Sequence, residues 1–166
     1  RFQEIVEASG VPYLDHEVEY PPGAVLGPEV LAGGDVVETQ VRLVVAMFAA
    51  DLGVGAILWR RWGERAGLAW LVIGVTLLPG SYLRFDLVAV LLAVGAMAMV
   101  GRRRAPAGGL LLAAAVLVKT WPLVVAPGLL RAGRRPALAA FVGAGTLAGL
   151  LWVGWVGADG PRQVLG

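Results

Sequence analysis

Cysteine is absent from this sequence, and charged side chains are scarce. The 166 residues include no cysteine, a single histidine and 16% charged residues, against 58% hydrophobic ones. Without thiols, a disulfide framework and a thiolate metal site are both excluded. The charged share is also well below the roughly 25% of soluble globular domains. The composition therefore indicates an integral membrane protein.

Long apolar runs account for most of the sequence after residue 40. At 1.5 Å per residue, a helical run of this kind crosses much or all of a ~30 Å hydrocarbon core. We expect an all-α, multi-pass transmembrane helical bundle, with residues 1–40 forming an outer loop. The chain opens without methionine and closes in a loop-like segment, so we also expect a fragment of a larger protein. The predicted spans within the transmembrane region 41–166 are about 41–59, 66–80, 86–101, a broken hairpin at 107–130, and 136–157.

Arginine placement predicts the orientation of these spans. Short loops rich in lysine or arginine stay on the cytoplasmic side of a membrane. Residues 1–40 hold eight acidic residues and one base, Arg1, which suits the opposite, extracytoplasmic face. Nine arginines form three clusters between apolar runs, namely Arg60/Arg61/Arg65, Arg102/Arg103/Arg104 and Arg131/Arg134/Arg135.

One apolar stretch is interrupted near its middle. Lys119-Thr120-Trp121-Pro122, followed by Pro127, divides residues 107–130 into two runs too short to span alone. Proline removes a backbone donor and clashes with the preceding helical turn. This favours a helical hairpin or re-entrant pair whose tip points outward, and the alternative is one kinked helix.

Ionisable residues near the predicted outer face are candidates for a site. A charge near hydrocarbon is costly and indicates function, and a bound anion would account for both Arg84 and Lys119. Asp86 lies at a helix start, where it can orient one of these cations, pair with Arg84 or act as an N-terminal cap. Asp51 lies in the middle of a span, so it should face the bundle interior or be protonated.

The outer loop alternates three acidic residues, Asp15, Glu17 and Glu19, just before Tyr20-Pro21-Pro22. An extended loop would point the three carboxylates to one side, which fits a general base, a metal site or a solvated face. The Tyr20-Pro21-Pro22 element has a structural alternative, since consecutive prolines hold polyproline geometry and tyrosine favours the membrane interface.

Several of these motifs resemble one family. Val11-Pro12-Tyr13-Leu14-Asp15 with Glu19-Tyr20-Pro21-Pro22 is similar to the PY-x-D…EYPP loop of polytopic bacterial mannosyltransferase-like proteins with the GT-C fold. This group contains the α-1,2-mannosyltransferases of phosphatidylinositol mannoside synthesis. Phe85-Asp86 looks like the aspartate that opens a later helix in that group. Gly109 with Lys119-Thr120-Trp121-Pro122 and Pro127 is similar to its G…K-x-x-P…P segment, so the resemblance extends from about Phe2 to Leu130.

The resemblance implies an activity as well as a fold. Such enzymes transfer a sugar, usually mannose, from a polyprenyl-phosphate donor to a lipid or glycan acceptor hydroxyl, with inversion, outside the bacterial plasma membrane. A carboxylate of the first outer loop is the base, here Asp15 or Glu19. Arg84 and Lys119 would contact the phosphate, with Asp86 orienting one of them and Tyr20 beside the substrate. No metal or other cofactor is expected.

Two other classes remain open from the sequence. A multi-pass transporter module would also use broken helices and intramembrane ions such as Asp51 and Lys119. A non-catalytic membrane scaffold would tolerate neutralisation of Asp15, Glu19 and Lys119. No nucleic-acid partner is expected, since the arginine clusters are short loops without an interleaved aromatic pattern.

Overall fold

The computed structural model describes residues 11–15, 18, 20–82, 85–100, 104–131 and 134–165. These residues form helices and connections, with no β-strand among them. The all-α class predicted from composition is therefore confirmed for this part of the chain. The helices are α2 (Pro22–Leu31), α3 (Val36–Trp62), α4 (Glu64–Ser81), α5 (Asp86–Val100), α6 (Ala105–Val118), the 3₁₀ helix η1 (Trp121–Val125), α7 (Ala126–Arg131), α8 (Arg135–Val156) and α9 (Asp159–Leu165).

Two of the described helices, α3 and α8, are long and apolar enough to cross a membrane by length and composition. Of the most apolar window of each helix, only 22% in α3 and 6% in α8 is buried inside the protein. The apolar helices α5 and α6 have 15 and 14 residues, which gives each a length of only about 21 to 23 Å. The larger number of spans stays a prediction.

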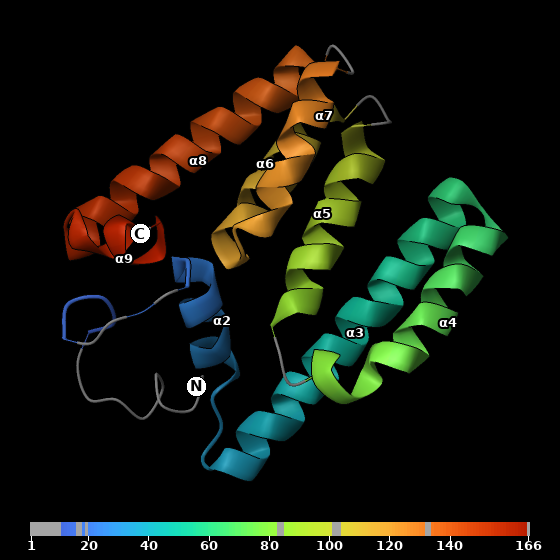
Figure 1. Cartoon of the computed structure of the whole chain (residues 1–166), viewed down its shortest axis with the longest axis horizontal. Helices are drawn as coiled ribbons and strands as arrows, with labels where there is room; N and C mark the ends of the chain where they lie inside the picture. Colours follow the sequence, from blue (N-terminus) through green and yellow to red (C-terminus); the bar gives the residue numbers. More distant parts are fainter. Residues whose placement is uncertain are drawn as a thin grey trace.

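The helices run alternately up and down (Figure 1). Helices α3 and α4 form one antiparallel pair, and α5 and α6 form the next. The chain then reverses between α6 and α7, and α8 runs back beside α6 (Figure 1). The broken hairpin at 107–130, with its tip toward the outer face of a membrane, stays a prediction. Because of this alternation, the helix ends next to the described arginines of all three clusters lie at one end of the bundle.

Small residues allow α5, α6 and α8 to approach closely. A Cβ atom added to Gly109 of α6 would lie 2.0 Å from the carbonyl oxygen of Ala137 in α8. One added to Gly108 would lie 2.8 Å from the carbonyl oxygen of Ala96 in α5. Neither backbone could accept a side chain there without moving, so these glycines fix the three helices against one another. Ala96, Leu112 and Ala137 are buried at this contact.

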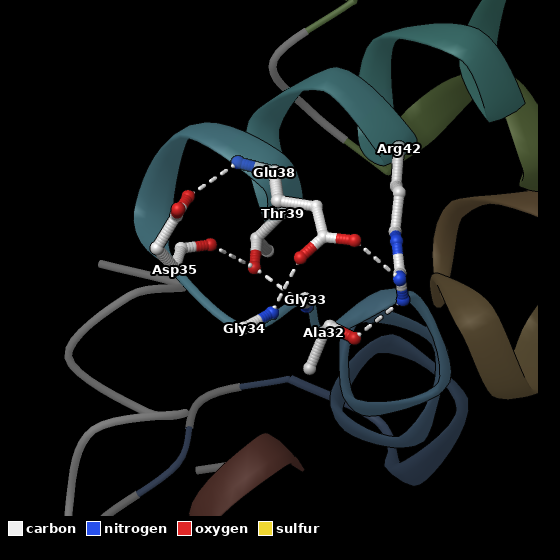
Figure 2. Close-up of polar contacts among 7 residues, drawn as sticks. All are labelled: Ala32, Gly33, Gly34, Asp35, Glu38, Thr39 and Arg42. Carbon is white, nitrogen blue, oxygen red and sulfur yellow. Dashed lines mark hydrogen bonds and ion pairs between the residues drawn. The ribbon is translucent and has the colours of Figure 1, made fainter.

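A local polar cluster connects the end of α2 to the start of α3 (Figure 2). Asp35 caps α3 by accepting a hydrogen bond of 2.7 Å from the Glu38 backbone N–H, and Glu38 accepts one of 2.7 Å from the Gly34 N–H. Arg42 then donates both to Glu38 and to the carbonyl of Ala32, which ends α2. Reciprocal capping of this kind satisfies donors that a helix start leaves open. The cluster therefore holds the end of α2 against the start of α3.

Candidate functional site

Three of the candidate residues meet at the end of the bundle opposite the arginines. Lys119 follows the last residue of α6, Asp86 begins α5, and Tyr20 lies just before α2. The Lys119 Nζ lies 3.0 Å from Asp86 Oδ1 and 4.6 Å from the centroid of the Tyr20 ring. The Lys119 side chain is only 14% exposed and that of Asp86 is 32% exposed. We call these three residues the Lys119 cluster.

Local backbone geometry directs Lys119 into this cluster. Its backbone is extended, with φ −149° and ψ 144°, while its N–H still donates to the carbonyl of Ala115 in α6. Helix α6 therefore ends at Val118, and the following Pro122, which has no N–H to donate, belongs to η1. This break turns the lysine away from its own helix axis, so that it can reach the start of α5.

The position of Asp86 suits a carboxylate. It occupies the first turn of α5, where the unpaired N–H groups and the helix macrodipole favour negative charge. Lys119 then neutralises that charge from the neighbouring helix, and the face of Tyr20 adds a cation–π contact. An ammonium group has three N–H donors, so one carboxylate and one ring leave it able to bind a further anion.

The structure does not bring Asp15 into the Lys119 cluster. Asp15 is exposed at the end of the turn formed by residues 11–15, where its Oδ2 accepts a hydrogen bond of 2.5 Å from the Val11 N–H. This contact closes the turn and holds the carboxylate at the surface. The two other candidates, Glu19 and Arg84, lie outside the described residues. Within the described part of the chain, no three potential ligands gather into a metal site.

The sequence did not identify how the loop before Tyr20 is anchored. The Tyr13 hydroxyl donates to the Tyr20 carbonyl at 2.6 Å. Gln163 of α9 donates to the Tyr13 carbonyl and accepts from the Val18 N–H, both at 3.1 Å. The Tyr13 ring also meets Trp152 of α8 edge to face, with centroids 5.4 Å apart. The C-terminal helices therefore hold the loop that carries Asp15 and Tyr20.

Tyr13 is unusual within this loop. It is 2% exposed and has a φ of 71°, in the left-handed region that residues other than glycine rarely adopt. Burial raises the pKa of its hydroxyl above the ordinary value, so the group stays neutral and can donate to Tyr20. Tyr13 could have been singled out from the sequence, because it belongs to the Pro12-Tyr13 dipeptide of the quoted motif. Nothing in the sequence pointed to Gln163.

Asp51 faces the interior of the bundle, which was one of the two predictions made for it. It is 9% exposed. Trp70 Nε1 donates to its Oδ1, and the Tyr82 hydroxyl donates to its Oδ2, each at 2.7 Å. Both donors belong to α4 or its end, so Asp51 links α3 to α4. This arrangement satisfies the carboxylate inside the protein.

Comparisons of the chain with protein-family models, with curated proteins and with solved structures found no match.

Proposed function

We propose that this protein is a membrane glycosyltransferase. It would move a sugar, mannose in the family that it resembles, from a polyprenyl-phosphate donor to an acceptor hydroxyl at the extracytoplasmic face. The observation that carries the proposal is the Lys119 cluster. Its members come from three separate motifs of that resemblance, and they meet at the bundle end opposite the exposed arginines.

Lys119 has the chemistry required at the leaving group. When the bond between the anomeric carbon and the donor oxygen breaks, negative charge develops on the lipid phosphate, and a fixed cation stabilises that charge. Asp86 holds the ammonium group in place at 3.0 Å. The Tyr20 ring packs against the cation and limits its exposure to water, which strengthens its attraction for a phosphate oxygen.

The acceptor hydroxyl must lose a proton as it attacks the anomeric carbon. A carboxylate within hydrogen-bond reach can take that proton, and the loop held by Tyr13 carries Asp15 as well as Tyr20. One oxygen of the exposed Asp15 accepts the Val11 N–H, so the other can accept the proton. Glu19, next to Tyr20 in the sequence, is the second candidate for the base.

The length of α6 supports a donor that arrives within the lipid. Helix α6 begins beside the exposed Arg104 and ends at Val118, just before Lys119, after 14 residues, a rise of about 21 Å. A hydrocarbon core is ~30 Å thick. If Arg104 lies at the cytoplasmic headgroups, Lys119 stays below the outer headgroup level, so a donor would reach it from the lipid rather than from open water.

A transfer assay tests the proposal. Membranes containing the full chain are supplied with radiolabelled polyprenyl-phosphate mannose, and incorporation into acceptor is compared for Asp15→Asn, Glu19→Gln and Lys119→Ala. Arg42→Ala is the matched control, because Arg42 is an exposed cation in a local ion pair. We expect Lys119→Ala and one carboxylate variant to lose transfer, and Arg42→Ala to retain it.

Two results would contradict the proposal in different ways. Undiminished transfer in all three site variants would remove the assigned residues while leaving the activity. Absence of transfer by the unsubstituted protein from any polyprenyl-phosphate sugar would remove the activity itself.

A further inference from the structure

The hydrogen bond between Asp51 and Tyr82 lies next to the connection between α4 and α5. Asp86, a member of the Lys119 cluster, follows this connection. Tyr82 lies at the end of α4, and Asp86 begins α5 four residues later. The Tyr82 hydroxyl donates to Asp51 Oδ2 of α3, and its ring packs near Phe48 of the same helix, with centroids 6.4 Å apart. The end of α4 is therefore fixed to α3 by a polar and an aromatic contact.

Phe85, the residue just before α5, is held from another direction. It is 7% exposed and belongs to a buried cluster that includes Met47 of α3 and Val118 of α6. A Cβ atom added to Gly27 of α2 would lie 2.5 Å from the Phe85 ring, so this ring lies close against the α2 backbone. The residue just before Asp86 is thus held between α2, α3 and α6.

We propose that Asp51 is a positioning residue for the Lys119 cluster. Acting through Tyr82, it fixes the start of α5 and so keeps Asp86 within reach of Lys119. Asp51 itself touches neither substrate nor Lys119. The catalytic consequence of this role rests on the proposed function, whereas the positional role does not.

A carboxylate is suited to this role for a geometric reason. Each of its oxygens accepts one donor, Trp70 on Oδ1 and Tyr82 on Oδ2, whereas an asparagine would offer only one acceptor oxygen. An apolar contact between α3 and α4 would avoid the desolvation cost of a buried carboxylate. It would, however, hold the two helices together with less directionality than the two hydrogen bonds to Asp51. Asp51 therefore orients the end of α4 at Tyr82, in addition to holding α4 against α3.

The chain offers a matched pair of variants to test this. Tyr82→Phe and Trp70→Phe each remove one neutral donor from the same carboxylate, but only Tyr82 lies next to the connection. The absence of cysteine allows a thiol pair, Asp86→Cys with Lys119→Cys, to be introduced into the full chain in membranes. The rate of cross-linking by a short bifunctional thiol reagent then reports the separation of the two positions without any assay of activity.

We expect Tyr82→Phe to slow cross-linking about tenfold or more, the size of effect that loss of a hydrogen bond to a charged group produces. Trp70→Phe should stay within about twofold of the parent pair. Equal rates in the parent and Tyr82→Phe would overturn the proposal. So would an equal fall in both variants, because this would indicate a merely structural role for Asp51.

A kinetic measurement tests whether the positioning role of Asp51 affects catalysis. In the chain without added cysteines, Tyr82→Phe should raise the KM for polyprenyl-phosphate mannose about five- to tenfold, with a smaller change in kcat, and Trp70→Phe should leave the KM in place. An unchanged KM in Tyr82→Phe would contradict this consequence. If the unsubstituted protein transfers no sugar, the proposed function fails, and cross-linking still decides the positional role.

Discussion

Two carboxylate–cation pairs in this protein differ in where their partners come from. Glu38 and Arg42 lie one turn apart on α3, with side chains 48% and 45% exposed for Arg42 and Glu38 respectively. Asp86 and Lys119 come from different helices, and the lysine is 14% exposed. An exposed pair at this spacing contributes little to stability because water and salt screen it. A sheltered pair has a desolvation cost that only good geometry offsets, so its presence calls for a specific role.

Because of this difference, one pair depends on local structure and the other on the tertiary arrangement. The Glu38–Arg42 pair belongs to a helix start encoded by neighbouring residues, and it forms wherever α2 and α3 form (Figure 2). The Asp86–Lys119 pair requires α5 and α6 to be in register, and the ring contact with Tyr20 further requires the loop before α2 to be docked. It therefore reports the tertiary arrangement, and substitutions around it should have larger and less local effects than substitutions around Arg42.

Lys119→Met should have the largest effect, because it keeps the apolar stem and removes the cation. We expect transfer from polyprenyl-phosphate mannose to fall by about 10²- to 10³-fold, the usual cost of losing one charge-stabilising group. The free energy of unfolding should fall by about 1 to 3 kcal/mol, since the ion pair between Lys119 and Asp86 is lost. Adding Asp86→Asn should restore stability but not transfer. Recovery of transfer in the double variant would mean that Lys119 acts only on the fold.

Much of the architecture was predictable because it depends on composition and local chemistry. Scarce charge predicted apolar helices, Pro122 predicted the break after α6, and the cost of a charge in mid-span predicted that Asp51 faces inward or is protonated. From the sequence, Lys119 and Asp86 could be predicted to lie on the same side of the bundle, but not to contact each other. Their direct contact depends on the register between α5 and α6, which Gly108 sets through its close packing against Ala96 of α5.

The anchoring contacts could not be predicted. Gln163 bonds to residues 145 and 150 positions earlier in the chain, and a hydrogen bond at such separation leaves no periodic pattern in the sequence. The Asp51–Tyr82 bond is similar, since it depends on the crossing of α3 and α4. The turn that occupies one oxygen of Asp15 was missed because the loop was treated as extended, whereas aspartate readily bonds to nearby backbone N–H groups.

Gly23→Ala should have the next largest effect. A Cβ atom at Gly23 of α2 would lie 2.7 Å from the Leu117 carbonyl oxygen of α6, so α2 must shift and carry Tyr20 away from Lys119. Backbone contacts of this kind cannot relax by rotating a side chain. We expect a loss of about 1 to 3 kcal/mol in the free energy of unfolding and a clear loss of transfer.

Gly34→Ala is the control for Gly23→Ala. Gly34 lies beside the local pair, and an added Cβ atom would lie 3.4 Å from Glu38 Oε2, which is close to ordinary contact. Thermal unfolding of both variants in the same detergent makes the comparison. Equal destabilisation would mean that the α2–α6 contact is no more demanding than the helix cap, and the distinction between the two regions would fail.

Tyr20→Leu should have an intermediate effect. It removes the aromatic face over Lys119, and a cation–π contact at a partly sheltered site contributes about 0.5 to 2 kcal/mol. Tyr20→Phe keeps the ring, and the hydrogen bond from Tyr13 goes to the Tyr20 backbone, so neither contact should change. We expect transfer and stability to fall further in Tyr20→Leu than in Tyr20→Phe, which keeps the ring over Lys119. A loss in Tyr20→Phe as large as in Tyr20→Leu would instead assign the role to the Tyr20 hydroxyl.

Arg42→Met should have the smallest effect, although Arg42 makes two contacts. It loses an exposed ion pair that salt already screens and a hydrogen bond to the Ala32 carbonyl, which water can replace at the surface. The melting temperature should therefore change by only about 1 °C or less, and the difference from the parent should shrink further as salt is raised from low to high concentration. Transfer should be unaffected. A fall in transfer comparable with that of Lys119→Met, at equal protein level, would show that the α2–α3 angle controls the Lys119 cluster and that the two ion pairs act together.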